Sequence, residues 1–402
     1  MKLGNIAQGD DFFDRKRELE DPQRYLRDDH IALVGPRRLG KSSLLVRLQE
    51  ILHKQGALTA YLDVQGAKTV AQFLEALDQG FPDHSIQNHL RELAKRPAGV
   101  LKKIKKLDLK LPTGAGGVSL ETQEQSPPET PWDWTPQAQA LQKRLLSAPA
   151  IILIDEFPVF LETLIKTDQT QAETFLAWLR AWRQHPDMAG RFIYSGSIGL
   201  NALLERHGLH THFNDPVQME LGPFTRNAAG AMLRHFARQQ GWTLQDAAVA
   251  CLCDRVGWLS PYYLNLLLNE SFLAARDRWD ETRSETGEIE PQDIEAGYER
   301  LLTSRSRFSH WRQRLRDALP ADEYPLCQAL LTAVATSQDG LTLRQLHNRL
   351  AKQQPDPDRR ERQLGLLLSR LGEEGYLSAP DAQGRLRFLS FPLRDWWRRN
   401  HA

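Results

Sequence analysis

A glycine-rich stretch between two apolar runs constrains the fold of this chain more than any other feature. Residues 31–34 are apolar and indicate a buried strand, and the leucines that follow Ser43 at three- and four-residue spacing indicate a helix. Between them lies the pattern Gly-x-x-x-x-Gly-Lys-Ser, at residues 35–42. A strand, a loop of this pattern and a helix, in this order, predict a phosphate-binding loop.

Each residue type in this loop suits the binding of a phosphate anion. Gly35 and Gly40 allow the backbone to approach phosphate oxygens closely, and N–H groups at the start of the helix point towards an anion. Lys41 supplies a positive charge for the β- and γ-phosphates, and the Ser42 hydroxyl is a suitable oxygen ligand for Mg²⁺. The residues predicted to contact the nucleotide are Gly35, Pro36, Arg37, Arg38, Leu39, Gly40, Lys41, Ser42 and Ser43.

A second strong pattern is the apolar run AIILIDEF at residues 150–157, which ends in two acids. A parallel strand buried on both faces has this composition, and acids at its carboxyl end face the ligand crevice of an open α/β sheet. We predict that Asp155 binds Mg²⁺ through water and that Glu156 polarises the attacking water. The alternative is a helix start that carries acids in its first turn.

A further predicted strand, at residues 191–197 (RFIYSGS), ends in small hydroxyl side chains. Ser195 and Ser197 are therefore candidates for a hydrogen bond to the γ-phosphate or to the attacking water. The alternative is a strand-to-helix turn in which a serine caps the helix.

Composition gives few further constraints on function. The chain has 402 residues, enough for two or three domains, and its formal net charge of +1 indicates that any electrostatic surface for a partner is local. The start of the chain lacks the apolar stretch of a signal peptide, and no apolar run is long enough to span a membrane. The three cysteines suit a reducing compartment. We therefore expect a cytoplasmic protein without a membrane partner.

The patterns along the chain predict four parts. An α/β core at residues 1–224 contains a proline-punctuated, lysine-rich insertion at residues 82–135, and a helical lid follows at 225–303. After a linker helix at 304–320, residues 321–402 show three helices and a hairpin, the order of a winged helix.

The third of these C-terminal helices is rich in arginine. The arginines on it are Arg359, Arg360, Arg362 and Arg370. This helix is predicted to contact either duplex DNA or a protein partner.

Together these stretches resemble the ASCE class of P-loop ATPases. Within that class, the chain is most similar to the archaeal ATPase group, which is related to AAA+ and STAND ATPases. The resemblance rests on the stretches FFDRKREL, GPRRLGKSSLL, IILIDEF, FIYSGSIGL, GWLSPYYL and FLSFPLRDWW.

The resemblance implies an α/β fold with a parallel sheet of order 5-1-4-3-2, a helical lid over the nucleotide and a C-terminal winged-helix domain. It also implies that Arg15 lies on the nucleotide side and that Pro261 and its neighbours contact the adenine or the ribose. One departure concerns the arginine finger that relatives often carry before the fifth strand. Residues 213–215 are Phe-Asn-Asp in this chain.

ATP is the expected nucleotide, because the chain lacks the Asn-Lys-x-Asp stretch that guanine recognition requires. The leading hypothesis is an ATP- and Mg²⁺-dependent switch that hydrolyses ATP slowly to ADP, since no finger is evident. Two alternatives stay open. One is a DNA-binding initiator or transposition-like loader that forms homo-oligomers with ATP. The other is an ATP-binding scaffold without hydrolysis.

Overall fold

The computed structural model describes residues 6–81, 133–196, 199–279 and 287–401. Nearly all of the predicted insertion at 82–135 lies outside these ranges, as does Ser197. The described chain forms two compact units, one of residues 1–48 with 195–402 and one of residues 49–194.

A five-stranded parallel sheet forms the α/β part of the chain, with strand order β2-β3-β4-β1-β5. This is the predicted order 5-1-4-3-2 viewed from the other edge, so the predicted fold class is confirmed. The strands are β1 (Ile31–Val34), β2 (Leu58–Asp63), β3 (Ala150–Asp155), β4 (Arg191–Ser195) and β5 (Val217–Glu220). Every residue of β3 except Ile151 is buried, as its continuous apolar sequence requires.

The unit formed by residues 49–194 contains a core of stacked aromatic side chains. Phe73 lies 5.2 Å from Phe160 and 5.0 Å from Phe175, measured between ring centroids. Trp182 is fully buried in the same unit. The helices that supply this core are α3 (Val70–Gln79), α5 (Thr135–Leu145), α6 (Phe157–Thr167) and α7 (Gln169–Arg183).

The other unit begins with two short segments before β1 and continues with helices around β5. Helix α2 starts in this unit and ends in the other. These elements are η1 (Gly9–Asp11), α1 (Lys16–Tyr25), α2 (Lys41–Lys54), α8 (Leu200–Arg206) and η3 (His210–Phe213).

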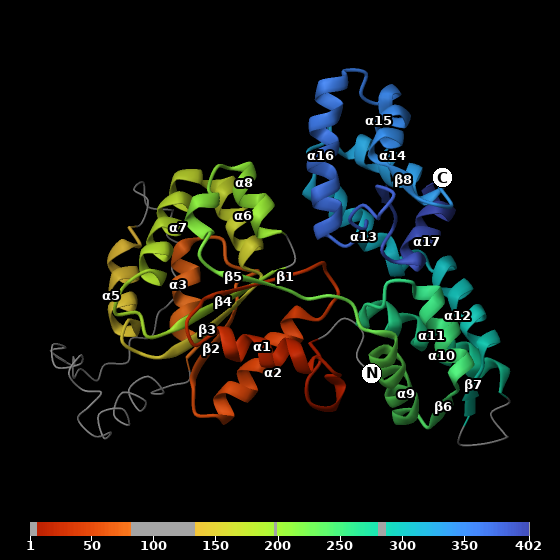
Figure 1. Ribbon diagram of the computed structural model, residues 1–402, viewed down its shortest axis with the longest axis horizontal. Helices are drawn as coiled ribbons and strands as arrows, with labels where there is room; N and C mark the ends of the chain where they lie inside the picture. The colour runs from red at the N-terminus through yellow and green to blue at the C-terminus, as the bar shows by residue number, and fades with distance from the viewer. Residues whose placement is uncertain (1–5, 82–132, 197–198, 280–286, 402) are drawn as a thin grey trace, which may run out of the picture. The chain divides into compact units, whose positions relative to one another are not determined.

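The predicted lid contains four helices (Figure 1). They are α9 (Arg226–Gln239), α10 (Asp246–Val256), α11 (Pro261–Arg278) and α12 (Pro291–Thr303). Two three-residue strands, β6 (Trp242–Leu244) and β7 (Gly287–Ile289), pair in parallel beside them. The sequence did not predict this pair, because three residues are too few to show an alternating pattern.

The C-terminal residues form the predicted three helices, here α14 (Tyr324–Ala335), α15 (Leu343–Arg349) and α16 (Pro357–Glu373), after α13 (Arg305–Ala318). The predicted hairpin is present in part. Leu377 and Phe388 form an antiparallel bridge, and β9 (Arg385–Leu386) pairs with β8 (Leu341–Thr342). A 3-10 turn, η4, covers Leu350–Lys352, and a further helix, α17 (Phe391–His401), was not predicted.

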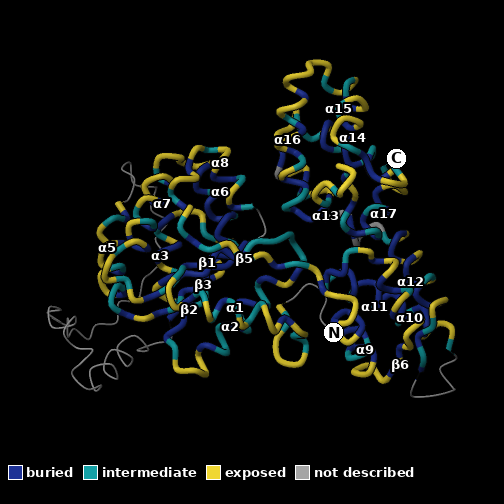
Figure 2. The backbone as a smooth tube through the Cα atoms, viewed as in Figure 1, coloured by how far each residue is buried: buried dark blue, intermediate teal, exposed yellow. Residues whose placement is uncertain are grey.

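The lid and the C-terminal helices share one hydrophobic core. A single cluster of buried side chains runs from Phe224 through Tyr263 and Trp311 to Trp397. Figure 2 shows buried residues along α11 and the inner faces of the C-terminal helices. In the described part of the chain, every helix is too short or too polar to cross a membrane.

Candidate nucleotide site

The predicted phosphate-binding loop connects β1 to α2, and both of its glycines adopt a backbone conformation that other residues rarely reach. Gly35 has φ 143°, and a Cβ there would lie 2.5 Å from the carbonyl oxygen of Leu221. Gly40 has φ 89°, with no atom within 4 Å of its ideal Cβ position. Gly35 is therefore needed for close packing on the end of β5, and Gly40 for the curve of an open cradle.

Lys41 lies against the inside of this loop. Its side chain is buried, and the ammonium Nζ donates to the carbonyl oxygens of Gly35 at 2.5 Å and Pro36 at 2.9 Å. A lysine ammonium is a compact charge on a flexible stem. It can exchange these carbonyl contacts for the oxygens of a phosphate bound in the cradle.

Backbone strain gathers in the segments that the sequence assigns to the nucleotide. Among the described non-glycine residues, those with positive φ are Asp14 (56°), Arg15 (72°), Arg38 (70°) and Glu156 (56°). A left-handed conformation costs a non-glycine residue about 1–3 kcal/mol, and such strain clusters at ligand and catalytic sites. The distribution of strain therefore supports a functional site at these segments.

Arg15 is buried against the loop. Its NH2 nitrogen donates to the carbonyl oxygen of Leu39 at 3.3 Å, and its NH1 nitrogen forms an ion pair with Glu18 at 2.7 Å. The guanidinium carbon also lies 4.4 Å from the centre of the Phe224 ring. These contacts make Arg15 a support for the loop, and its contact with the nucleotide stays a prediction.

The lid turn contacts the loop through residues on both sides of Pro261. The fully buried Ser260 donates from its Oγ to the carbonyl oxygen of Arg38 at 2.6 Å. The Arg38 guanidinium lies 4.1 Å from the centre of the Tyr262 ring. Pro261 is the first residue of α11, a position that suits proline because it lacks a backbone N–H. Its own contact with adenine or ribose is not tested, and the contacts of Arg38 were not predicted.

The predicted acids lie at the end of β3, in the unit of residues 49–194: Asp155 is the last residue of the strand, and Glu156 follows it. Asp155 is buried, and its two carboxylate oxygens accept hydrogen bonds from the Tyr61 hydroxyl and the Glu156 backbone N–H, both at 3.1 Å. Burial, reinforced by the nearby Asp155 carboxylate, raises the pKa of Tyr61 well above its usual value of 10.0. The phenol is therefore a permanent donor that fixes the Asp155 carboxylate.

Glu156 stands at the N-cap of α6 and makes no capping hydrogen bond with its side chain. The alternative was a helix start with acids in its first turn, and the first turn of α6 contains no acid. Glu156 itself has a left-handed backbone, with φ 56°.

Ser195 ends β4 as a buried hydroxyl. Its side-chain oxygen has no hydrogen-bond partner among the described residues. A buried polar group without a partner costs about 1–3 kcal/mol, so a ligand oxygen or a water would stabilise it. The cap of the following helix, α8, is Gly199, which removes the alternative role of Ser195 as a helix cap.

The donors predicted for Mg²⁺ have suitable chemistry, since a serine hydroxyl at the start of α2 and a buried carboxylate after β3 are hard oxygen ligands. Within the described ranges, no group of three His, Cys, Asp or Glu side chains is placed to hold a metal.

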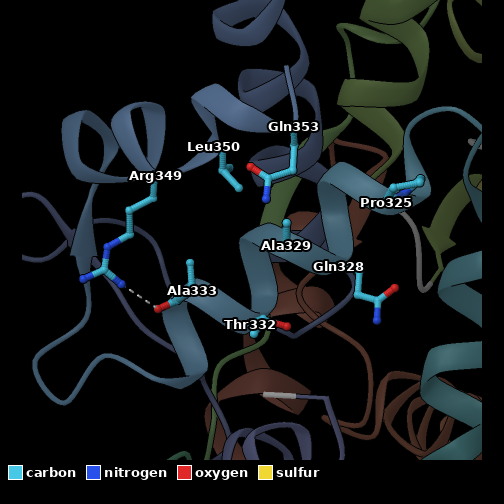
Figure 3. Close-up of a pocket in the computed structure, with 8 residues that line it drawn as sticks. All are labelled: Pro325, Gln328, Ala329, Thr332, Ala333, Arg349, Leu350 and Gln353. Atoms are coloured by element: carbon cyan, nitrogen blue, oxygen red, sulfur yellow. Dashed lines mark hydrogen bonds between the residues drawn. The ribbon is translucent and has the colours of Figure 1, made fainter. Parts of the chain in front are cut away.

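A cavity of about 450 Å³ lies elsewhere, between one face of α14 and residues 349–353. Figure 3 shows Arg349 directed towards α14, where its NH1 nitrogen donates to the carbonyl oxygen of Ala333 at 3.4 Å. The lining contains no carboxylate, cysteine or histidine. This cavity therefore lacks the groups that phosphate chemistry needs.

The basic face predicted on α16 is smaller than the sequence suggests. Arg360 and Arg370 are buried, and Arg360 donates to the carbonyl oxygen of Pro355 at 3.2 Å. Arg359 is exposed and forms an ion pair with Asp322 at 3.6 Å. Arg362 is exposed on the same helix.

Comparison with known proteins supports the fold. No protein-family model matches the chain, and no curated protein sequence matches it. The chain is similar to the solved structure of the Walker-type ATPase Paby2304 of Pyrococcus abyssi, with a TM-score of 0.63 and 16% identity over 99% of each chain. The chain has the P-loop ATPase fold.

A second solved structure shows the same fold. The ORC2 protein of Aeropyrum pernix, described as ADPNP-ADP complexes, has a TM-score of 0.53 and 12% identity, over 98% of this chain and 94% of that one. At these identities the likeness concerns the fold, and function has to be argued from the residues of the site.

Proposed function

We propose that this chain binds ATP with Mg²⁺ on the loop at residues 35–43 and hydrolyses it slowly to ADP and phosphate. The observation that carries the proposal is the position of Lys41. Its buried ammonium lies inside a loop whose backbone depends on the positive φ angles of Gly35 and Gly40. The strained backbone of Arg38 and the partnerless Ser195 hydroxyl support it.

The roles of the residues follow from their chemistry. Lys41 neutralises charge on the β- and γ-phosphates, Ser42 and Asp155 hold Mg²⁺, and Glu156 accepts a proton from the attacking water. Bound Mg²⁺ would neutralise charge that develops on the phosphate oxygens. Ser195 donates to the γ-phosphate or orients the water, and Ser197 is proposed to assist it.

We further propose that the nucleotide acts as a state marker in a switch. Residues 213–215 lack an arginine finger, which is the group that accelerates hydrolysis most in related chemistry. The C-terminal residues then contact a partner in one nucleotide state. Because two of the four arginines on α16 are buried, a protein partner is favoured over duplex DNA.

Nucleotide binding tests the proposal directly. Lys41→Ala should lower ATP affinity about 10- to 100-fold, since a hydrogen bond to a charged group contributes about 1.5–3 kcal/mol. Lys54→Ala is the matched control, because Lys54 is an exposed lysine at the other end of the same helix. Calorimetric titration with ATP measures both. Equal affinity in wild type and Lys41→Ala would overturn the assignment of the loop.

Turnover tests the second acid. Glu156→Gln should bind ATP as wild type does and should hydrolyse it about 10²- to 10⁴-fold more slowly, the usual contribution of a positioned general base. Release of phosphate under saturating ATP measures the rate. Unchanged turnover would remove Glu156 from its role while leaving the binding proposal intact.

A further inference from the structure

The end of α16 lies on the phosphate-binding loop. The carboxylate of Glu374 forms an ion pair with Arg37, with 2.9 Å between Oε2 and Nε. The same oxygen accepts a hydrogen bond from Arg314 of α13 at 2.5 Å. Glu374 is only 7% exposed, so this ion pair is shielded from water and salt.

Two neighbours of Glu374 extend this contact. Gly375 has φ 84°, and a Cβ built on it would lie 3.5 Å from Pro36 Cβ and 3.7 Å from Arg37 N. Glu373 touches Gly199, because a Cβ on that glycine would lie 2.0 Å from the carboxyl carbon of Glu373. Residues 373–375, hereafter the carboxylate latch, thus contact the loop and the segment that follows Ser195.

The latch brings negative charge to segments that are proposed to bind a triphosphate. Glu374 neutralises the Arg37 charge that the loop would otherwise offer to an anion. Glu373 is held in a largely buried place: burial raises the pKa of its carboxyl, while a hydrogen bond from the Gly199 N–H opposes the rise. The carboxylates of the latch and the phosphates of a nucleotide would repel each other at short range, and this repulsion is stronger away from bulk water.

We propose that the carboxylate latch is an autoinhibitory element that opposes nucleotide binding, so that ATP and the closed latch exclude each other at the loop. This inference rests on the proposed function, since it assigns a regulator to the same site. Linkage makes the effect reciprocal: ATP opens the latch, and any partner that holds the latch open tightens ATP binding by the same factor.

The shared core gives this competition a mechanical consequence. The lid and the C-terminal helices belong to one cluster of buried side chains, and Tyr376 continues that cluster directly after the latch. The Tyr376 hydroxyl donates to the carbonyl oxygen of Trp311 at 2.8 Å, which ties the latch to α13. Release of Glu374 from Arg37 therefore removes one of the contacts that hold the lid and the C-terminal helices to the loop.

The test removes the charge of the latch without changing its shape. Glu374→Gln and Glu373→Gln should each raise ATP affinity about fivefold or more, the lower end of typical coupling between sites. Glu361→Gln is the matched control, since Glu361 is an exposed glutamate on the same helix. Calorimetric titration with ATP measures affinity.

Hydrogen exchange gives a second readout that does not depend on affinity. In wild type, ATP should increase exchange over residues 371–378, and Glu374→Gln should show the increased exchange without nucleotide. If Glu374→Gln folds poorly, Glu373→Gln supplies the same test through the other carboxylate of the latch.

The outcomes separate this inference from the proposed function. If wild type binds ATP, Lys41→Ala does not, and both glutamine variants match wild type in affinity and exchange, the latch is overturned alone. Weaker ATP binding in Glu374→Gln would also overturn it. If neither wild type nor Glu374→Gln binds ATP, the proposed function fails and the latch fails with it. ATP binding by Glu374→Gln but not by wild type would support both.

Discussion

At the scale of single residues, the candidate site is distinguished by side chains held in place before any ligand arrives. Asp155 is the clearest case, because both of its oxygens accept hydrogen bonds and its side chain is buried. A carboxylate fixed in this way loses little freedom when it binds a metal ion or its water shell. The donor that fixes it from outside its own strand is Tyr61.

We therefore expect Tyr61→Phe to raise the Mg²⁺ concentration needed for half-maximal ATP turnover, by about tenfold for the loss of one hydrogen bond to a charged group. ATP affinity without Mg²⁺ should not change, because Tyr61 holds Asp155, which is proposed to act through the metal ion alone. Tyr324→Phe, in α14, is the control. An unchanged Mg²⁺ dependence would show that Tyr61 does not position the metal ligand.

Residue-scale prediction from sequence succeeded where a pattern was contiguous. Both glycines of the loop have the positive φ that the pattern requires, and Asp155 is the last residue of a buried strand. Tyr61 could not be predicted, because its partner lies on another strand and depends on the pairing of β2 with β3. The burial of Arg360 was also missed, since an arginine in a polar helix is usually exposed.

At the scale of elements, helix starts were predictable because local chemistry determines them. Pro261 and Pro291 each occupy the first position of a helix, and Thr225 and Asp168 accept capping hydrogen bonds. Helix α17 was not predicted, and it follows directly after the residues of the predicted hairpin. Nothing local in residues 391–401 shows that they cover α12.

A buried hydrogen bond between Tyr298 and Asp395 joins α12 to α17. The Tyr298 hydroxyl of α12 donates to Asp395 Oδ2 at 2.6 Å, and Arg394 Nε donates to Oδ1 at 2.7 Å. Burial alone would raise the pKa of Asp395, but the hydrogen bonds from Arg394 and Tyr298 outweigh it and lower that pKa below its usual 3.8. The ionised carboxylate is therefore the form that stabilises the fold.

We expect Asp395→Asn to lower the free energy of unfolding by about 1–3 kcal/mol at neutral pH. An acid with a lowered pKa contributes stability above its unfolded pKa and loses it as pH falls through the folded pKa. The difference between wild type and Asp395→Asn should therefore shrink as pH falls below about 3.8, the usual pKa of an aspartate. Urea unfolding between pH 7 and pH 3 measures it, with the exposed Asp28→Asn as control. A constant difference would contradict the assignment.

At the scale of the whole molecule, one hydrophobic core includes side chains from three parts of the chain that the sequence pattern separates. The sequence pattern changes at the boundaries predicted for the lid (225–303), the linker helix (304–320) and the winged helix (321–402). These boundaries stay predictions. The apolar faces of these three parts, however, belong to one cluster, which includes Tyr263 of α11, Trp311 of α13 and Trp397 of α17. Sequence patterns reveal which faces are apolar, but they do not reveal which element covers each face.

This shared core predicts what removal of the C-terminal helices would do. A chain that ends at residue 320 would expose lid side chains that α17 covers in the full chain, because α17 packs against both α10 and α12. Each large apolar side chain returned to water costs about 1.5–3 kcal/mol, so a few of them exceed the margin of a typical domain. We expect the truncated chain to lose hydrogen-exchange protection in α10 and α12 and to bind a hydrophobic dye, while the strands of the sheet stay protected. If residues 321–402 instead formed an independent domain, the lid helices of the truncated chain would keep the hydrogen-exchange protection that they have in the full chain. That result would contradict the inference that the lid and the C-terminal helices move together.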